Sequence, residues 1–183
     1  MTKNDSALPR DPNFARKEAF ANVKAMVIKM KAVIQRVKEA SVRIDGETVG
    51  SCGNGLMILL GVAEGDTEKE ASMLADKISK LRIFSDENGK MNLSITDIGG
   101  SLLVVSQFTL LADYRRGNRP DYLASAKPEC ANRLYEYFIE LMRNKGFATG
   151  TGRFGADMQV SLINDGPVTI VMDTDVLKAP KNA

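Results

Sequence analysis

The feature that most constrains the fold is an apolar run, Leu56-Met57-Ile58-Leu59-Leu60-Gly61-Val62, which follows Gly55 and contains no charged side chain. A short apolar run bounded by glycine is typical of a β-strand covered on both faces. A strand with one face in water alternates polar and apolar residues instead. We therefore expect residues 56–62 to form a central strand of a sheet.

The segments around this strand predict further strands and a hairpin. Asp45-Gly46 is a turn signal between two β-forming patterns, so a hairpin is expected to open the domain. Near the other end of the chain, Asn164-Asp165-Gly166-Pro167 predicts a turn between two more strands. The predicted strands outside the central run are residues 32–37, 40–44, 47–49, 102–106, 157–163 and 168–172.

Two helices are predicted between the strands. Thr67 and Glu70 have the spacing of a capping box, and Pro128 suits the first turn of a second helix that Gly146 ends. Apolar residues then recur at helical intervals, which gives each helix one buried stripe. The stripes are Ala71, Leu74, Ala75, Ile78 and Leu81 in the first helix, and Cys130, Leu134, Tyr137, Phe138 and Leu141 in the second.

These elements predict an α/β fold with a single domain. Two packed or strongly curved β-sheets carry the two helices on one side, which gives a three-layer arrangement. The length of 183 residues and the 44% hydrophobic content are those of one ordinary globular domain. We expect this domain to span residues 30–177, followed by a tail over residues 178–183.

Residues 1–29 differ from the rest and are expected to be a flexible extension. They carry a net charge of +3, whereas the other 154 residues carry −1. A short helix after Asp11-Pro12 is one interpretation. The segment lacks the apolar stretch of about 7–15 residues that a secretory signal needs, but an organellar address stays open. No apolar run of about 20 residues predicts a membrane span.

The chain contains no histidine, which excludes a Ser-His-Asp triad, an imidazole base and histidine metal ligands. Its two cysteines, Cys52 and Cys130, form no redox or zinc motif, and a reducing compartment fits best. The carboxylates Asp113, Asp121 and Asp157 are scattered along the sequence. We therefore expect neither a metal nor a cofactor.

Polar residues interrupt the end of a predicted buried strand at Ser106-Gln107-Phe108-Thr109-Leu110. Ligands commonly bind at strand ends in α/β sheets, and the hydroxyls, the amide and the backbone N–H groups here could stabilise an oxyanion. The alternative is that these hydroxyls satisfy nearby turn carbonyls.

Two further segments are candidates for function. Gly166-Pro167 can adopt a cis peptide bond, since that form costs only about 0.5–1 kcal/mol before proline, although an ordinary hairpin turn is the alternative. The loop with Arg115, Arg116 and Arg119 suits contact with phosphates, although a solvated basic loop is the alternative.

Taken together, these motifs resemble the D-aminoacyl-tRNA deacylases, also called D-tyrosyl-tRNA deacylases. Ser-Gln-Phe-Thr-Leu at 106–110 and Asn-Asp-Gly-Pro-Val-Thr at 164–169 are similar to that family's paired signature. The resemblance runs from residue 30 to about residue 175 without large gaps. It also includes residues 30–37, 40–42, 55–62, 81–84, 89–92 and 154–158.

The resemblance implies an enzyme that hydrolyses the ester between a D-amino acid and the 3′ end of tRNA, and that also accepts glycine mischarged on tRNA-Ala. It implies a cytoplasmic homodimer in which the active site lies at the subunit interface. There the Ser106–Leu110 segment of one subunit would face Gly166-Pro167 of the other, with that peptide bond cis.

The resemblance also implies roles for individual residues. Gly166 and Pro167 would exclude an L side chain, and Gln107 and Thr109 would flank the ester. The catalytic set would be Ser106, Gln107, Phe108 and Thr109, with Phe154, Ala156 and Met158 near the adenosine and pocket wall, and with Arg115, Arg116 and Arg119 on the tRNA.

Two mechanisms stay open, a Thr109 nucleophile and assistance by the 2′-hydroxyl of the tRNA. We favour the second, because neither a histidine nor a lysine lies within the motif to activate Thr109. The competing function is a non-catalytic nucleic-acid-binding protein that uses the basic loop at residues 115–119.

Overall fold

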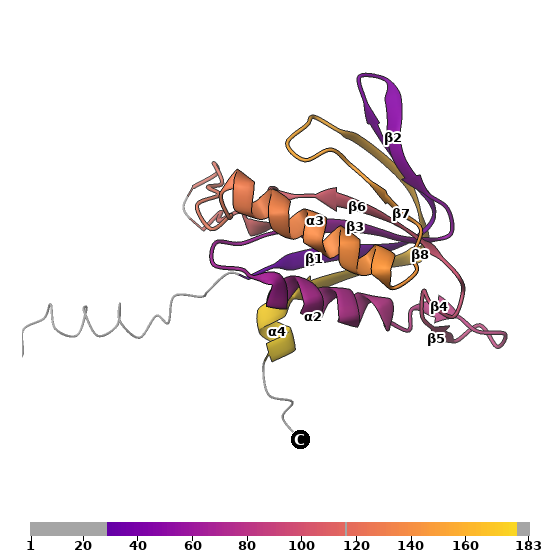
Figure 1. Ribbon diagram of the computed structural model, residues 1–183. Coiled ribbons are helices and arrows are strands. Elements are labelled where there is room, and N and C mark those ends of the chain that lie inside the picture. The colour runs from indigo at the N-terminus through magenta and orange to yellow at the C-terminus, as the bar shows by residue number, and fades with distance from the viewer. Residues whose placement is uncertain (1–28, 116, 179–183) are drawn as a thin grey trace, which may run out of the picture.

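The computed structural model describes residues 29–115 and 117–178, in which the predicted helices and strands occur in the predicted order, together with several short elements that were not predicted (Figure 1). The predicted short helix within residues 1–29 lies outside this range, apart from Lys29. The elements are β1 (Lys31–Ile44), β2 (Glu47–Cys52), β3 (Gly55–Gly61), α2 (Glu68–Ser79), β4 (Phe84–Ser85), β5 (Met91–Leu93), β6 (Ser101–Ser106), the 3-10 helix η1 (Phe108–Leu111), α3 (Pro128–Asn144), β7 (Thr149–Thr151), β8 (Gln159–Asp173) and α4 (Thr174–Lys178).

Strand β1 organises the sheet. Its first half pairs with β3 and its second half with β2, while β8 runs antiparallel along its other edge. Beyond β3 the sheet continues through β6 to β7, and these strands are parallel to one another. The carboxyl ends of β3, β6 and β7 therefore lie at the same edge of the sheet.

The sheet is strongly curved, as the sequence predicted, and β2 comes back against β7. A Cβ atom on Gly50 would lie 2.1 Å from the carbonyl oxygen of Thr151, and one on Gly150 would lie 2.3 Å from that of Ser51. Only glycine permits this backbone approach. Figure 1 shows β2 and the segment leading into β8 rising from the rest of the sheet.

Helices α2 and α3 pack beside each other on one face of the sheet, which confirms the predicted arrangement (Figure 1). The predicted capping box begins α2: Thr67 accepts from the backbone of Lys69, and Glu70 accepts from that of Thr67. In α3 the inward face is shifted from the prediction. Tyr135, Ile139 and Met142 are buried, whereas Tyr137 and Leu141 are only half-buried.

Two apolar clusters stabilise the domain, one on each face of the sheet. The larger lies between the sheet and the helices and includes Ile34, Ile58, Leu74 and Phe138. Full burial of each such side chain contributes about 1.5–3 kcal/mol. The smaller lies within the curve of the sheet and contains Val37, Ala40, Val42, Cys52, Met57, Leu103 and Val105.

The prediction of a turn at residues 164–167 is wrong. β8 continues through these residues and pairs with β1 on both sides of them. Gln35 is opposite Thr169 and Val37 is opposite Asn164, so residues 165–168 bulge out opposite Arg36 alone. The predicted strands at 32–37 and 40–44 are one continuous strand, long enough to pair with both halves of β8. We call residues 165–168 the β8 bulge.

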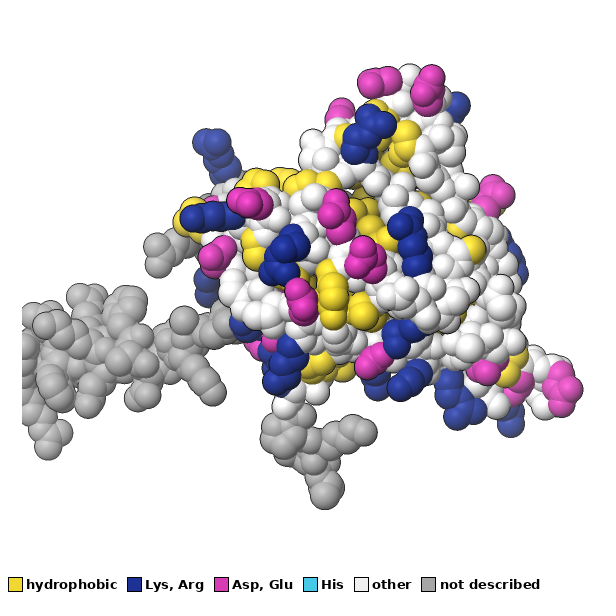
Figure 2. All heavy atoms as spheres, viewed as in Figure 1, with side chains coloured by type: hydrophobic (Ala, Val, Ile, Leu, Met, Phe, Trp, Pro, Cys, Tyr) yellow, Lys and Arg dark blue, Asp and Glu magenta, His cyan; other side chains and the backbone are white. Residues whose placement is uncertain are grey.

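No helix within residues 29–115 and 117–178 has the length and apolar character needed to cross a membrane. On the face that carries the helices, positively and negatively charged side chains are interspersed, so this face has no large patch of one charge (Figure 2).

Candidate active site

A cavity of about 760 Å³ lies where the parallel strands end. Val62 follows β3, Ser106 ends β6, and Phe154 follows β7, and all three residues line the cavity. Ligands bind at this edge in many α/β sheets, because the loops that leave adjacent parallel strands diverge there. We call this cavity the strand-end pocket.

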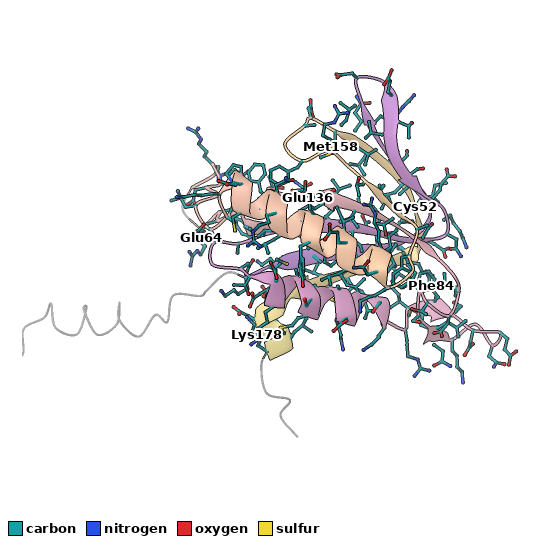
Figure 3. All side chains as sticks on the ribbon, viewed as in Figure 1. Cys52, Glu64, Phe84, Glu136, Met158 and Lys178 are labelled. Atoms are coloured by element: carbon teal, nitrogen blue, oxygen red, sulfur yellow. The ribbon has the colours of Figure 1, made fainter. Side chains whose placement is uncertain are left out.

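The strand-end pocket contains six of the predicted site residues. Ser106, Gln107 and Phe108 come from the end of β6 and the start of η1. The opposite wall is formed by the segment between β7 and β8, to which Met158 belongs (Figure 3). The predicted residues from that wall are Phe154, Ala156 and Met158.

Helix η1 positions the polar residues of the motif. The backbone N–H of Gln107 donates to the carbonyl oxygen of Leu60 at 2.8 Å, which fixes the end of β6 to β3. The chain then turns into η1, and the side-chain amide of Gln107 donates to the hydroxyl of Thr109. Thr109 is exposed and lies beside the pocket rather than among its lining residues.

Three aromatic residues, Phe108, Tyr122 and Phe154, line the pocket, and Tyr122 was not predicted from the sequence. Its ring meets the ring of Phe108 edge-on, with 5.0 Å between the centroids. On the other side of the pocket, the ring centroids of Phe154 and Tyr135 are 6.2 Å apart. The buried Tyr135 hydroxyl donates to the carbonyl oxygen of Val104 at 2.8 Å, and burial raises its pKa to about 12, so it stays a donor.

A turn beneath the pocket is held by Asp66. Its carboxylate accepts from the backbone N–H of Ala63 at 2.7 Å, and the neighbouring N–H of Glu64 donates to Ala124. This pairing supports residues 124–126, of which Ser125 and Ala126 line the pocket. Burial raises the pKa of Asp66 to about 6, although the amide donors of Ala63 and Met30 oppose the shift. The other carboxylate oxygen of Asp66 has no hydrogen-bond partner among the described residues.

The β8 bulge carries Gly166-Pro167, whose peptide bond is cis. Arg36, buried beneath it on β1, was not singled out by the sequence reasoning. Its guanidinium donates to the carbonyl oxygen of Asp165 at 2.9 Å and to that of Ile83 at 2.6 Å. It also lies 3.3 Å from the Asp165 carboxylate. Gly166 is in a positive-φ conformation, and a Cβ atom on it would lie 2.9 Å from the Arg36 guanidinium.

Within one chain the structure does not bring all predicted site residues together. Gly166 and Pro167 are exposed on the bulge and do not line the strand-end pocket. In the predicted basic loop, Arg115 forms hydrogen bonds and an ion pair with Asp113, and Arg119 is exposed. Arg116 lies outside the described residues. No cluster of three or more histidine, cysteine or acidic side chains suited to a metal occurs in the described part of the chain.

The fold and the pocket define an α/β protein with a ligand site at parallel strand ends, built from hydroxyl, amide and aromatic groups. Residues 33–173 match the family model described as D-Tyr-tRNA(Tyr) deacylase. This chain therefore belongs to the D-Tyr-tRNA(Tyr) deacylase family.

The match with this chain covers nearly the full length of similar proteins. A D-aminoacyl-tRNA deacylase of Roseiflexus castenholzii is 56% identical over 153 residues, which is 84% of this chain and 98% of that protein. A D-aminoacyl-tRNA deacylase of Thermosipho africanus is 57% identical over 145 residues, which is 79% of this chain and 97% of that protein.

Solved structures share the fold. The structure titled c-Myc DNA Unwinding Element Binding Protein is 43% identical, with a TM-score of 0.73, and the match covers 78% of this chain and 97% of that one. A probable eukaryotic D-amino acid tRNA deacylase is 15% identical, with a TM-score of 0.67 over 79% of this chain and 98% of that one, and this likeness shows the fold alone.

Proposed function

We propose that this protein hydrolyses the ester bond of D-aminoacyl-tRNA and releases the free D-amino acid and tRNA. The observation that carries this proposal is the family match over residues 33–173, which includes both the strand-end pocket and the β8 bulge. An aminoacyl ester is already activated, so positioning and oxyanion stabilisation suffice for its hydrolysis. A site without histidine is therefore adequate.

The active site is proposed to form between two copies of the chain. A wall that rejects L side chains must face the ester, yet Gly166 and Pro167 lie outside the pocket of their own chain. A second copy supplies the wall if its bulge enters the mouth of the pocket. Exposed apolar side chains on β8 support such an interface, because Ile163 is 54% and Val171 69% exposed. Light scattering that gives a monomer mass at assay concentration would contradict this arrangement.

Chiral selection in this proposal works by exclusion. The backbone of Gly166-Pro167 occupies the space that an L side chain needs, while a D side chain points away from it. Glycine has no side chain to exclude, so glycyl-tRNA mischarged on tRNA-Ala is a second substrate. The preferred D-amino acid is not set by such a wall.

Hydrolysis is proposed to use the substrate's own 2′-hydroxyl. The side-chain amide of Gln107 donates a hydrogen bond to the hydroxyl of Thr109, so it cannot take a proton from the Thr109 hydroxyl and activate it as a nucleophile. The backbone N–H groups that begin η1 have no acceptor within the helix, and they are suited to the oxyanion of the tetrahedral intermediate. The 2′-hydroxyl relays the proton: water loses a proton as it adds to the carbonyl carbon. The bond between that carbon and the 3′-oxygen of the ribose then breaks, and the 3′-oxygen takes the proton as it leaves. No metal or cofactor takes part.

The remaining assignments follow from the same proposal. Residues 30–177 form the deacylase domain, with residues 1–29 and 178–183 outside it, and the protein acts in the cytoplasm. Phe154, Ala156 and Met158 form the wall against the terminal adenosine, and Arg115, Arg116 and Arg119 contact the tRNA.

The test measures release of tyrosine from D-Tyr-tRNA and L-Tyr-tRNA side by side, with low-micromolar enzyme and a no-enzyme control. We expect rapid loss of the D ester alone. The competing function is salt-sensitive nucleic-acid binding without turnover, through the basic loop. One structural relative carries a DNA-binding title, so a duplex DNA is added as a binding probe. Loss of neither ester together with DNA binding would overturn the proposal in favour of that alternative.

A further inference from the structure

Asn164 occupies the point where β8 leaves its pairing with β1. Asn164 is opposite Val37, and the next paired residue of β8 is Thr169, opposite Gln35. Asn164 and Thr169 are therefore the paired residues that flank the β8 bulge. Because only Arg36 lies opposite it on β1, the ladder itself does little to fix its conformation.

The side-chain amide of Asn164 bridges the two ends of the β8 bulge. Its oxygen accepts from the backbone N–H of Val168 at 2.8 Å. Its nitrogen donates to the hydroxyl of Thr169 at 3.1 Å and to the carbonyl oxygen of Val168 at 3.4 Å. A backbone N–H can only donate, so the orientation of the amide is fixed. Both halves of the carboxamide are used, which no carboxylate could reproduce.

Val168, which this amide holds, is in turn next to the residue proposed to form the wall. A Cβ atom on Gly166 would lie 2.8 Å from the Cγ2 atom of Val168 and 3.1 Å from its backbone nitrogen. Arg36 anchors the bulge from below at Asp165, and Asn164 closes it at Val168. Gly166 and Pro167 lie between these two anchors.

We infer that Asn164 is a positioning residue that sets the stereoselectivity of the enzyme, by fixing the Gly166-Pro167 wall through the backbone of Val168. This inference rests on the proposed function. Exclusion by a backbone wall depends on the wall not yielding, since a shift of about 1 Å makes room for part of a side chain. Without the amide bridge, the wall yields to an L side chain while the strand-end pocket is unchanged.

The test compares kcat/KM for D-Tyr-tRNA and L-Tyr-tRNA in four variants. Asn164→Ala removes every contact of the bridge, Asn164→Asp keeps only the acceptor, and Thr169→Val removes one acceptor. Asn88→Ala, on the exposed β4–β5 turn, is the matched control. We expect the D-to-L ratio to fall about tenfold in Asn164→Ala, which corresponds to about 1.4 kcal/mol. The fall is smaller in Asn164→Asp, smaller again in Thr169→Val, and absent in Asn88→Ala.

The expected fall comes from faster hydrolysis of the L ester, which a loss of folded protein cannot produce. An unchanged ratio in folded Asn164→Ala would overturn the inference, and so would an equal decline of both rates. If Asn164→Ala does not fold, Thr169→Val decides by the same ratio. A wild-type protein that hydrolyses neither ester overturns the proposed function, and the inference with it, whereas an active wild type with unaltered variants overturns the inference alone.

Discussion

The strand-end pocket and the β8 bulge belong to one proposed site but are built in opposite ways. The pocket lies where parallel strands end and is enclosed by loops, aromatic rings and a 3-10 helix. The bulge interrupts an antiparallel pair and is exposed, held by side chains from below and at its ends.

This difference separates two tasks of an enzyme that selects by chirality. In the proposed mechanism the pocket holds and activates the ester, which fits a lining of polar residues at the end of β6 with aromatic residues around them. The bulge has only to be rigid and in the right place, so its important atoms belong to the backbone. Substitutions in the two regions should accordingly affect different quantities.

Arg36→Ala should have the largest effect, and on the bulge side. It leaves the carbonyl oxygens of Asp165 and Ile83 without their donor, while the Asp165 carboxylate keeps Lys38 at 3.2 Å, so we expect a loss of about 2–4 kcal/mol of unfolding free energy. Urea unfolding measures it. Arg43→Ala, on the exposed end of the same strand, serves as the control. Equal losses in the two variants would show that Arg36 does not anchor the bulge.

On the pocket side, Asp66 should make stability depend on pH. Burial raises its pKa to about 6, above the ordinary value of 3.8, so its contribution is complete below pH 4 and is lost as the pH rises through 6. The expected loss of unfolding free energy is roughly 2–3 kcal/mol, because each unit by which the pKa is raised corresponds to about 1.4 kcal/mol.

Asp66→Asn keeps an acceptor for the N–H of Ala63 and cannot ionise. Relative to wild type it should therefore gain stability at pH 7.5 but not at pH 4. Urea unfolding at both pH values tests this, with the exposed Asp157→Asn as control. A variant equally destabilised at both values would rule out the role given to Asp66. The charged groups near Asp66 are Lys29, Glu70 and Lys178, and they are the same in the wild type and in Asp66→Asn.

Thr109→Ala should lower kcat for D-Tyr-tRNA by less than about tenfold, because the hydroxyl is not the nucleophile in substrate-assisted hydrolysis. A substrate whose terminal adenosine lacks the 2′-hydroxyl should lose far more in the wild-type enzyme. Single-turnover hydrolysis measures both. A Thr109→Ala protein that binds substrate normally yet shows no turnover above background would instead establish Thr109 as the nucleophile.

Arg119→Ala should have the smallest effect. An exposed arginine that contacts a phosphate supports binding but not chemistry, so KM should rise a few-fold with kcat unchanged. The slope of log KM against the logarithm of the salt concentration should become smaller by less than about one. Titration with tRNA at several salt concentrations measures the slope. Identical slopes for wild type and variant would remove Arg119 from the tRNA surface.

Much of the fold could be predicted because local signals agreed with the final packing. The apolar run at residues 56–62 became β3, and the Thr67–Glu70 capping box begins α2. The pocket followed from the polar residues at the end of β6, since strand ends are general sites for ligands. The strands β4, β5 and β7 were missed because they are too short to show a period of two.

The bulge was predicted wrongly for a physical reason. Asn, Asp, Gly and Pro in sequence are a turn signal, but a long partner strand can keep such residues within one strand by letting the excess bulge out. Arg36 and Asn164 were missed because their partners lie on other elements or on the bulge itself. A charged residue inside the alternating pattern of β1 was the one available signal for Arg36.

The central claim is that one copy's pocket works with another copy's bulge, and subunit mixing tests it most directly. One variant, Ala156→Phe, fills the pocket, and a second, Gly166→Ala, disrupts the bulge, since its Cβ atom would lie 2.8 Å from Val168. Ala156→Phe alone should be inactive, whereas Gly166→Ala alone should hydrolyse L-Tyr-tRNA as well as D-Tyr-tRNA. When equal amounts of the two are unfolded and refolded together, half the dimers are mixed, and in each of these the one open pocket faces the intact bulge of the other chain. We expect hydrolysis of L-Tyr-tRNA per Gly166→Ala chain to fall to about half, while hydrolysis of D-Tyr-tRNA stays unchanged. An unchanged rate with L-Tyr-tRNA, in a mixture shown to contain mixed dimers, would contradict the shared site.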